Sequence, residues 1–141
     1  MLNVVCPHCL ATNRIPKKDH YKKANCGKCK NSLLDTTPKS VDHEAFLKHI
    51  AHNDIPVIVD FWAPWCGPCR MIAPAYEAVA KELPLKARLI KVNTEENQIT
   101  PSGYNIRGIP TIIAFKDGKE VDRVSGALPQ DQLLSWVKRF V

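Results

Sequence analysis

The sequence of 141 residues has no hydrophobic run long enough to cross a bilayer, because Asp60 interrupts the longest one. No apolar stretch of the signal-peptide kind follows Met1. We therefore expect a protein without membrane attachment that resides in the reducing cytoplasm. Structural disulfides are rare in that compartment, so its Cys-x-x-Cys pairs indicate metal or redox sites.

Acidic residues are scarce in the first forty positions. Residues 1–40 carry eight lysines and arginines against Asp19 and Asp35, a net charge of +6, whereas residues 41–141 carry twelve of each sign. Such a skew can indicate a nucleic-acid-binding surface. Only Tyr21 lies among these lysines, however, so bases would lack an aromatic stacking platform. We interpret the lysines as a solvated face and do not expect nucleic-acid binding.

Cysteines, in contrast, are plentiful, and the six of them form three Cys-x-x-Cys pairs. Sixteen residues separate the first two pairs, which is the spacing of a zinc ribbon. Residues 1–35 are too few and too rich in lysine to form a core alone, so a bound metal would supply the missing folding free energy. Four thiolates leave no open coordination position, so we predict one structural Zn²⁺. The predicted ligands are Cys6, Cys9, Cys26 and Cys29.

Other arrangements of this segment stay open. His8 or His20 could replace a cysteine ligand, the four cysteines could form disulfides, or the site could hold iron as a rubredoxin-like centre does. A Zn(Cys)₄ centre has a formal charge of about −2 and would reduce the excess positive charge of the segment.

The third pair follows an apolar, β-branched run. This run predicts a buried strand over residues 57–62, and the turn Ala63-Pro64-Trp65 leads from it into a helix that opens at Cys66. Residues three apart on a helix share a face, so Cys66 and Cys69 can form a disulfide or separate as a dithiol without large backbone movement. We interpret the pair as a reversible redox switch.

Around this pair, helix and strand patterns alternate. Residues 36–41 are a linker or an edge strand; helices are expected at 42–53, 66–83, 95–104 and 130–140, and further strands at 88–93, 110–116 and 119–125. In the first helix, Asp42 is the expected N-cap and Phe46, Leu47 and Ile50 share one side. The fold class is therefore α/β, a mixed central sheet with helices on both faces, preceded by a small zinc ribbon.

Disulfide chemistry assigns roles to three side chains. Only a thiolate attacks a disulfide, and the free N–H groups and dipole of the helix favour an anion at Cys66, so Cys66 is the predicted nucleophile. Cys69, one turn inward, is the predicted resolving cysteine. Asp60 interrupts an apolar strand, where burial raises the pKa of a carboxyl, and is the predicted base for the proton of Cys69. A carboxylate that turns to solvent at the strand end is the alternative.

The run from Val59 to Cys69, followed by Arg107-Gly108-Ile109-Pro110-Thr111, resembles the thioredoxin family. The resemblance covers roughly residues 41–141 and implies a thioredoxin domain over residues 42–141. It also implies a lysine near the aspartate, at Lys91, and a cis-proline at Pro110. The implied substrate-docking surface consists of Trp65, Gly67, Pro68, Gly108, Ile109 and Gly126.

The resemblance further implies protein disulfides as substrates, electrons from NADPH by way of thioredoxin reductase, and no bound organic cofactor. With its ribbon the chain is similar to the zinc-bearing thioredoxin 2 type. The dipeptide Gly67-Pro68 resembles that of reducing members, so we predict a protein-disulfide reductase. An oxidant, a disulfide isomerase, and a zinc-ribbon module that binds nucleic acid or protein are the alternatives.

Overall fold

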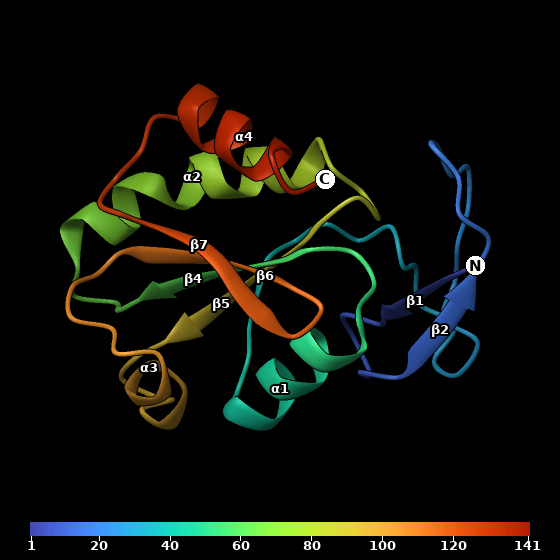
Figure 1. Cartoon of the computed structure of the whole chain (residues 1–141), viewed down its shortest axis with the longest axis horizontal. Coiled ribbons are helices and arrows are strands. Elements are labelled where there is room, and N and C mark those ends of the chain that lie inside the picture. The colour runs from blue at the N-terminus through green and yellow to red at the C-terminus, as the bar shows by residue number, and fades with distance from the viewer.

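The computed structural model describes all 141 residues and is built around a five-stranded mixed sheet (Figure 1). The strand order is β3-β5-β4-β6-β7. At its centre β4 (Val57–Trp62) runs parallel to β5 (Arg88–Asn93), which in turn pairs in parallel with the short edge strand β3 (Lys39–Ser40). The other edge is antiparallel, formed by β6 (Thr111–Lys116) and β7 (Lys119–Ser125). The predicted mixed sheet is confirmed, and its edge strand lies within residues 36–41.

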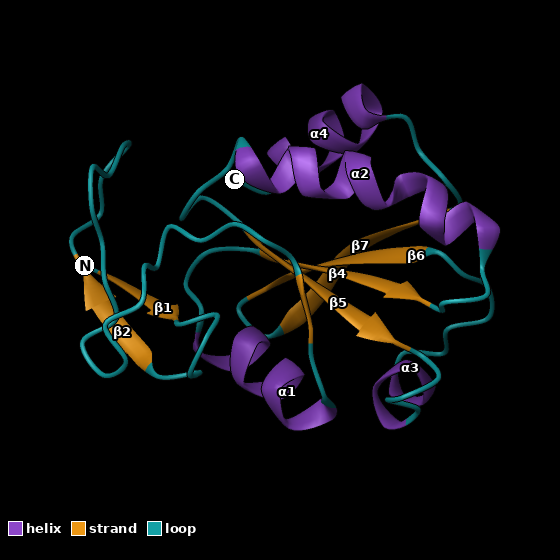
Figure 2. Cartoon of the chain, turned by 180° about the vertical axis from the view of Figure 1, so that it is seen from behind, coloured by secondary structure: helices purple, strands orange, loops and turns teal.

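Helices cover both faces of the sheet, as the figures show from opposite sides (Figures 1 and 2). One face is covered by α2 (Gly67–Lys81) and α4 (Gln130–Lys138), the other by α1 (His43–His52) and α3 (Ile99–Gly103). None of these helices has the length and apolar character needed to cross a membrane.

Side chains of β4 alternate between two apolar clusters, because successive residues of a strand point to opposite faces. Ile58 joins the cluster beneath α2 and α4, whereas Val57, Val59 and Phe61 join the cluster beneath α1. By the same alternation, Asp60 lies on the α2 side of the sheet. This placement brings the carboxyl to the face on which the cysteine helix lies.

Helix α1 begins as predicted, because the Asp42 side chain accepts a hydrogen bond from the backbone N–H of Ala45 at 2.8 Å. Its buried face differs from the prediction. Leu47 is 45% exposed, and the buried position is taken by His49. Phe46, His49 and Ile50 follow the i, i+3, i+4 spacing of a single face, so the prediction that Leu47 shares one side with Phe46 and Ile50 was wrong.

The third predicted helix is shorter than expected. Residues 94–96 form a turn, in which the backbone N–H of Glu95 donates to the Asn93 side chain, and α3 has only five residues. Pro101 lies in its first turn, where backbone N–H groups have no intrahelical partner, so the proline does not interrupt it. Helix α2 starts one residue later than predicted, with Cys66 as its N-cap.

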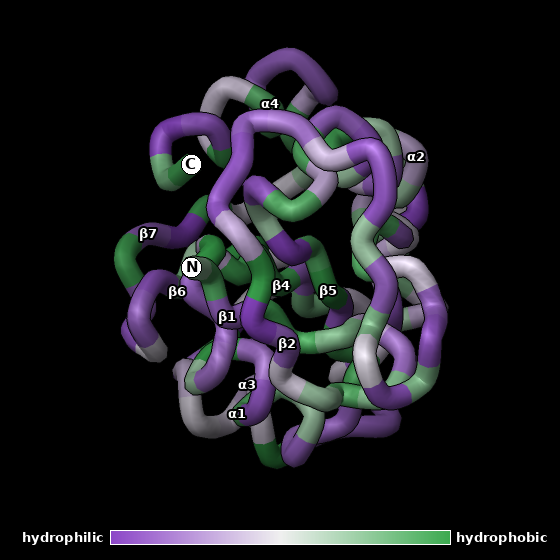
Figure 3. The backbone as a smooth tube through the Cα atoms, turned by 90° about the vertical axis from the view of Figure 1, so that its right-hand side faces the viewer, coloured by the Kyte–Doolittle hydropathy of each residue, from purple (hydrophilic) through white to green (hydrophobic).

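Residues 1–35, called here the N-terminal segment, lie at the end of the sheet opposite the start of α2 (Figure 1). The segment contains the antiparallel hairpin of β1 (Leu2–Val5) and β2 (Thr12–Ile15). Its apolar cluster includes Leu33 and is shared with Ile55 and Leu85 from the remainder of the chain. In Figure 3, hydrophobic residues gather along β4 and β5 behind this largely hydrophilic segment.

Two backbone contacts add to this shared cluster. The backbone N–H of Asp54 donates to the Asn3 carbonyl at 2.8 Å, and the Val5 N–H donates to the Asn53 side chain at 2.8 Å. The N-terminal segment is therefore docked onto residues 39–141, which we call the sheet unit.

Candidate active site and four-cysteine centre

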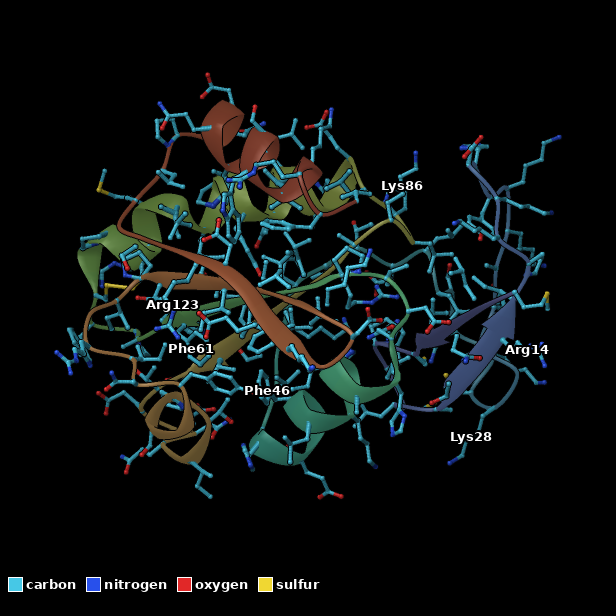
Figure 4. All side chains as sticks on the ribbon, in the orientation of Figure 1. Arg14, Lys28, Phe46, Phe61, Lys86 and Arg123 are labelled. Carbon is cyan, nitrogen blue, oxygen red and sulfur yellow. A yellow bond between two sulfur atoms is a disulfide. The ribbon has the colours of Figure 1, made fainter.

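The Cys66–Cys69 pair lies at the junction of β4 and α2. Cys66 is the N-cap of α2, and its Sγ accepts a hydrogen bond from the Cys69 backbone N–H at 3.2 Å. The two sulfurs are joined in a disulfide, with the Cα atoms 5.3 Å apart. Figure 4 shows this bond in yellow at the end of the molecule opposite Arg14 and Lys28. The predicted closeness of the two cysteines is confirmed.

Exposure does not distinguish the two cysteines, since Cys66 is 4% and Cys69 is 3% exposed. Position within the helix does distinguish them. Cys66 occupies the N-cap, where unpaired N–H groups and the positive end of the helix dipole stabilise an anion. Its Sγ lies 3.8 Å from the carbonyl oxygen of Ile109, at the side of the site. Gly67 and Pro68, which lie between the two cysteines, occupy the first positions of the helix, where a proline costs no hydrogen bond.

Asp60 is buried, with 1% of its surface exposed, and its Oδ1 has no hydrogen-bond partner. Burial raises the pKa of this carboxyl to about 7, against the opposing charge of Lys91. The alternative of a carboxylate that turns to solvent is therefore wrong. A carboxyl group with such a pKa exchanges a proton readily near neutral pH.

Lys91 pairs in register with Asp60 across the parallel strands β4 and β5. The side chain is half-buried, and its ammonium lies 4.4 Å from the centroid of the Trp62 ring, a cation–π contact. Its charge still acts on Asp60 and lowers the pKa of that carboxyl.

A shallow depression of about 410 Å³ adjoins the cysteines. Trp65, which is 65% exposed, lines it together with Gly108 and Ile109, and the far wall comes from Pro101 and Ser102 of α3. The structure thus brings three of the predicted docking residues together on one surface.

The loop before β6 completes this surface. The peptide bond between Ile109 and Pro110 is cis, and Pro110 is buried. Gly126, after β7, has a positive φ of 89° and donates its backbone N–H to the Pro110 carbonyl at 2.9 Å. Pro110 and Gly126 therefore lie next to each other.

Sequence reasoning missed Glu95 and Tyr76. The Trp65 indole Nε1 donates a hydrogen bond to Glu95 Oε1 at 2.6 Å, which holds the exposed ring. Glu95 follows β5, and the carboxyl ends of parallel strands meet at one edge of a sheet, so strand order would have placed it near Trp65. The Tyr76 hydroxyl lies within hydrogen-bonding distance of the carbonyls of Ile58 and Ile90, which ties α2 to both central strands.

The other four cysteines form a separate cluster in the N-terminal segment. All four Sγ atoms lie within 4.8 Å of one another, with 3.6 Å between Cys6 and Cys29 and between Cys9 and Cys26. A tetrahedral zinc with Zn–S bonds of about 2.3 Å places its sulfurs roughly 3.8 Å apart. The donor set and its spacing therefore fit Zn²⁺. His8 instead pairs with Asp35 at 3.0 Å, so the cluster is made by cysteines only.

The two cysteine loops of this cluster repeat the same backbone conformation. Cys6 N–H donates to the Ala11 carbonyl and Leu10 N–H to the Cys6 carbonyl; the second loop repeats both bonds between Cys26 and residues 30–31. In each loop the residue four positions after the first cysteine, Leu10 or Lys30, has a φ near +68°. The backbone N–H groups of His8 and Lys28 donate to the first sulfur of each loop, contacts that stabilise thiolate ligands.

A Cys-x-x-Cys pair at the start of a helix, beyond a buried parallel strand and beside a cis-proline loop, defines a thiol-disulfide oxidoreductase. The comparisons with known proteins agree, because the family model described as Thioredoxin matches residues 37–139. The chain belongs to the thioredoxin family. It is a thioredoxin-type disulfide reductase whose redox pair is Cys66–Cys69.

Individual relatives match over different parts of the chain. Thioredoxin C-3 of Corynebacterium nephridii is 39% identical over 134 residues, which cover 95% of this chain and 92% of that protein, so the match reaches into the N-terminal segment. A thioredoxin of Synechocystis is 43% identical over 108 residues, 77% of this chain and all of that protein. The solved structure of a mutant thioredoxin from Halobacterium salinarum superposes with a TM-score of 0.67 at 33% identity, covering 73% of this chain and 88% of that one.

Proposed function

We propose that Cys66 is the nucleophile of the disulfide reductase and that Cys69 resolves the reaction. In the reduced protein the Cys66 thiolate attacks one sulfur of a substrate disulfide, which forms a mixed disulfide and releases the other substrate sulfur as a thiolate. Cys69 then attacks Cys66 Sγ, which closes the Cys66–Cys69 bond and releases the second substrate sulfur. The observation that carries this assignment is the Cys69 N–H donated to Cys66 Sγ at the N-cap of α2.

Asp60 accepts the proton that Cys69 loses in the second step. Support comes from its burial on the α2 face of the sheet and from the rise of its pKa to about 7, which matches the task of a base near neutral pH. Lys91 lies in the adjacent strand β5, with its ammonium over the Trp62 ring. Its positive charge limits the rise in the pKa of Asp60 and so keeps the proton exchangeable.

The substrate is an extended protein segment that contains a disulfide. It docks on the surface around Cys66 made by Trp65, Gly67, Pro68, Gly108, Ile109, Pro110 and Gly126. The exposure of Trp65 and the depression beside it support this role. The backbone of Ile109, next to the cysteine sulfur, is the expected partner for substrate main chain.

Each turnover leaves the Cys66–Cys69 disulfide, so a dithiol donor must reduce it. From membership of the thioredoxin family we infer that this donor is NADPH-dependent thioredoxin reductase and that the protein resides in the cytoplasm. No organic cofactor is needed for the exchange itself.

The N-terminal segment is a zinc-ribbon domain over residues 1–35, linked through residues 36–41 to a thioredoxin domain over residues 42–141, as in the thioredoxin 2 type. Cys6, Cys9, Cys26 and Cys29 hold one structural Zn²⁺, which contributes folding free energy to a segment with little core of its own. Their mutual spacing and the hydrogen bonds to their sulfurs support this.

Trapping the intermediate tests the roles of the two cysteines. Reduced Cys69→Ser, mixed with a disulfide substrate such as insulin, is expected to accumulate a mixed disulfide through Cys66, detected by mass spectrometry as an adduct that dithiothreitol removes. An adduct on Cys69 in the matched Cys66→Ser variant, formed at the same rate, would contradict the assignment.

The reduction potential of the Cys66–Cys69 pair tests the direction of the reaction. A value close to that of other thioredoxins, about −270 mV, is expected, whereas about −120 mV would indicate an oxidant.

A further inference from the structure

Arg88, the first residue of β5, is a buried cation at the contact between the sheet unit and the N-terminal segment. The side chain is 4% exposed. Its Nη1 donates to the Asp35 carbonyl at 3.0 Å, its Nη2 donates to the Leu33 carbonyl at 3.3 Å, and its Nε has no partner. All of its hydrogen bonds therefore go to uncharged oxygens of the N-terminal segment.

No carboxylate forms an ion pair with Arg88. The Asp35 carboxylate, whose charge raises the pKa of Arg88, pairs instead with His8 Nε2 at 3.0 Å and with Lys39 Nζ at 3.5 Å. Burial, with the charge of Arg88, lowers the pKa of the neighbouring His49 to about 4, so this side chain is neutral at pH 7. A buried charge that no opposite charge contacts is strongly unfavourable, so Arg88 requires further negative charge nearby.

The four-cysteine centre is the available source of that negative charge. Cys6 is fully buried and belongs to the same apolar cluster as Leu33. A negative charge on Cys6, like that on Asp35, raises the pKa of the Arg88 guanidinium, which burial lowers. With four thiolates around a divalent metal, the centre has a formal charge of about −2. With four thiols or with two disulfides, its charge is zero, and only the Asp35 carboxylate, which is itself paired with His8 and Lys39, opposes the charge of Arg88.

We propose that Arg88 is the counter-ion of the metal-loaded four-cysteine centre and the residue through which the sheet unit favours metal loading. The proposal rests on the metal centre proposed above. Arg88 is a positioning residue, because it contacts the carbonyls that flank the cluster and no ligand atom. Its charge favours the metal-loaded form of the centre, and by reciprocity metal loading favours the docked position of the N-terminal segment.

Metal affinity of charge variants tests this proposal. Arg88→Met removes the charge at similar length, Arg88→Gln retains an amide donor without charge, and Arg88→Lys keeps the charge as the control. Competition against a chromophoric chelator is expected to show Zn²⁺ and Co²⁺ affinity at least about tenfold weaker in Arg88→Met and Arg88→Gln, as for other residues around metal ligands. Arg88→Lys is expected to stay within about threefold of wild type.

Thermal unfolding with zinc and with chelator separates charge from packing. The neutral variants are expected to lower the unfolding midpoint of the zinc-loaded protein and to leave unchanged, or raise, that of the metal-free protein. An equal fall in the unfolding midpoint of the zinc-loaded and the metal-free protein, or an unchanged metal affinity, overturns the counter-ion role of Arg88 and leaves the proposed metal centre intact. Wild-type protein that binds no metal overturns both proposals. Neutral variants that fail to fold with zinc while Arg88→Lys folds support the proposal, and failure of all three variants overturns it.

Discussion

The active-site cysteine pair and the two pairs of the N-terminal segment share the same spacing and differ in the chain that follows them. After Cys66 the backbone enters α2, so the N–H of Cys69 meets Cys66 Sγ and the two sulfurs of one pair join. After Cys6 and Cys26 the backbone instead turns back within five residues, through left-handed Leu10 and Lys30. The closest sulfur contacts there join different pairs, Cys6 with Cys29 and Cys9 with Cys26.

A Cys-x-x-Cys motif alone therefore does not specify its chemistry. At the start of a helix, a single cysteine pair lies at the positive end of the helix dipole and can react with a substrate disulfide, which suits thiol-disulfide exchange. Two turned loops facing each other make a four-sulfur cage, which suits a metal. The two sites also lie at opposite ends of the sheet (Figures 1 and 4).

The largest expected difference between the sites is in activity. Cys66→Ser removes the nucleophile and should reduce insulin reduction to the uncatalysed rate. Cys9→Ser, the matched change in the metal cluster, should lose bound zinc and keep activity within about tenfold of wild type, because its loop does not touch the exchange chemistry. An inactive, folded Cys9→Ser protein would show that the two sites are not separate.

Removal of zinc should affect one site and spare the other. With chelator, residues 2–33 should lose protection from amide hydrogen exchange, because the metal supplies folding free energy to this segment. The amides of β4 and β6 should stay protected, since their apolar clusters contain no residue of the segment. Mass-spectrometric hydrogen exchange checks this, and uniform loss of protection across the chain would contradict it.

Asp60 adds a pH dependence of stability at the active site. Its pKa is raised from 3.8 to about 7, so the folded protein binds a proton more tightly than the unfolded chain does. Its contribution to the free energy of unfolding is therefore fully present below pH 3.8 and is lost as the pH rises to about 7. At about 1.36 kcal/mol per pH unit, this loss amounts to roughly 4 kcal/mol. Relative to wild type, Asp60→Asn should be more stable in urea at pH 8 than at pH 4. An equal difference at both pH values would contradict the raised pKa.

Kinetics should reveal the second role of Asp60. Asp60→Asn removes the acceptor for the Cys69 proton, so release of the second substrate thiol should slow by about 10²-fold or more while formation of the mixed disulfide changes little. Stopped-flow tryptophan fluorescence and quenched-flow trapping follow the two steps. Equal slowing of both steps would indicate a role in Cys66 activation instead.

The smallest expected effect concerns Glu95, which accepts a hydrogen bond from Trp65 Nε1 on the exposed docking surface. Because exposed hydrogen bonds contribute little, Glu95→Ala should raise the KM for insulin by about two- to fivefold and leave kcat unchanged. Glu96→Ala, an exposed neighbour with no such contact, is the control. An equal rise in KM for both variants would indicate a general charge effect.

Local patterns predicted much of the fold. The bounds of β4, β5 and β7 agree with the sequence prediction, because each strand is an extended run bounded by turn residues such as Asp117-Gly118. The clustering of the four N-terminal cysteines also follows from their spacing. Residues 95–104 have no regular periodicity, so their pattern does not distinguish the turn at residues 94–96 from the short helix α3 that follows it.

Contacts between distant residues could not be predicted in this way. Trp65 meets Glu95 thirty residues later, and Arg88 meets the carbonyls of Leu33 and Asp35 more than fifty residues earlier. Such contacts depend on strand order and on how the N-terminal segment docks, and neither is encoded in a local pattern. The buried charge of Arg88 is therefore apparent only in the folded structure.

The most direct test of the claim that backbone context separates the three cysteine pairs is a zinc assay combined with thiol titration of the oxidised protein. We predict one zinc ion per chain and no reactive thiol in the native protein, four thiols after chelation under denaturing conditions, and two more after reduction. Metal-free protein with all six thiols already reactive, or zinc that is lost when Cys66 and Cys69 are replaced by serine, would contradict it.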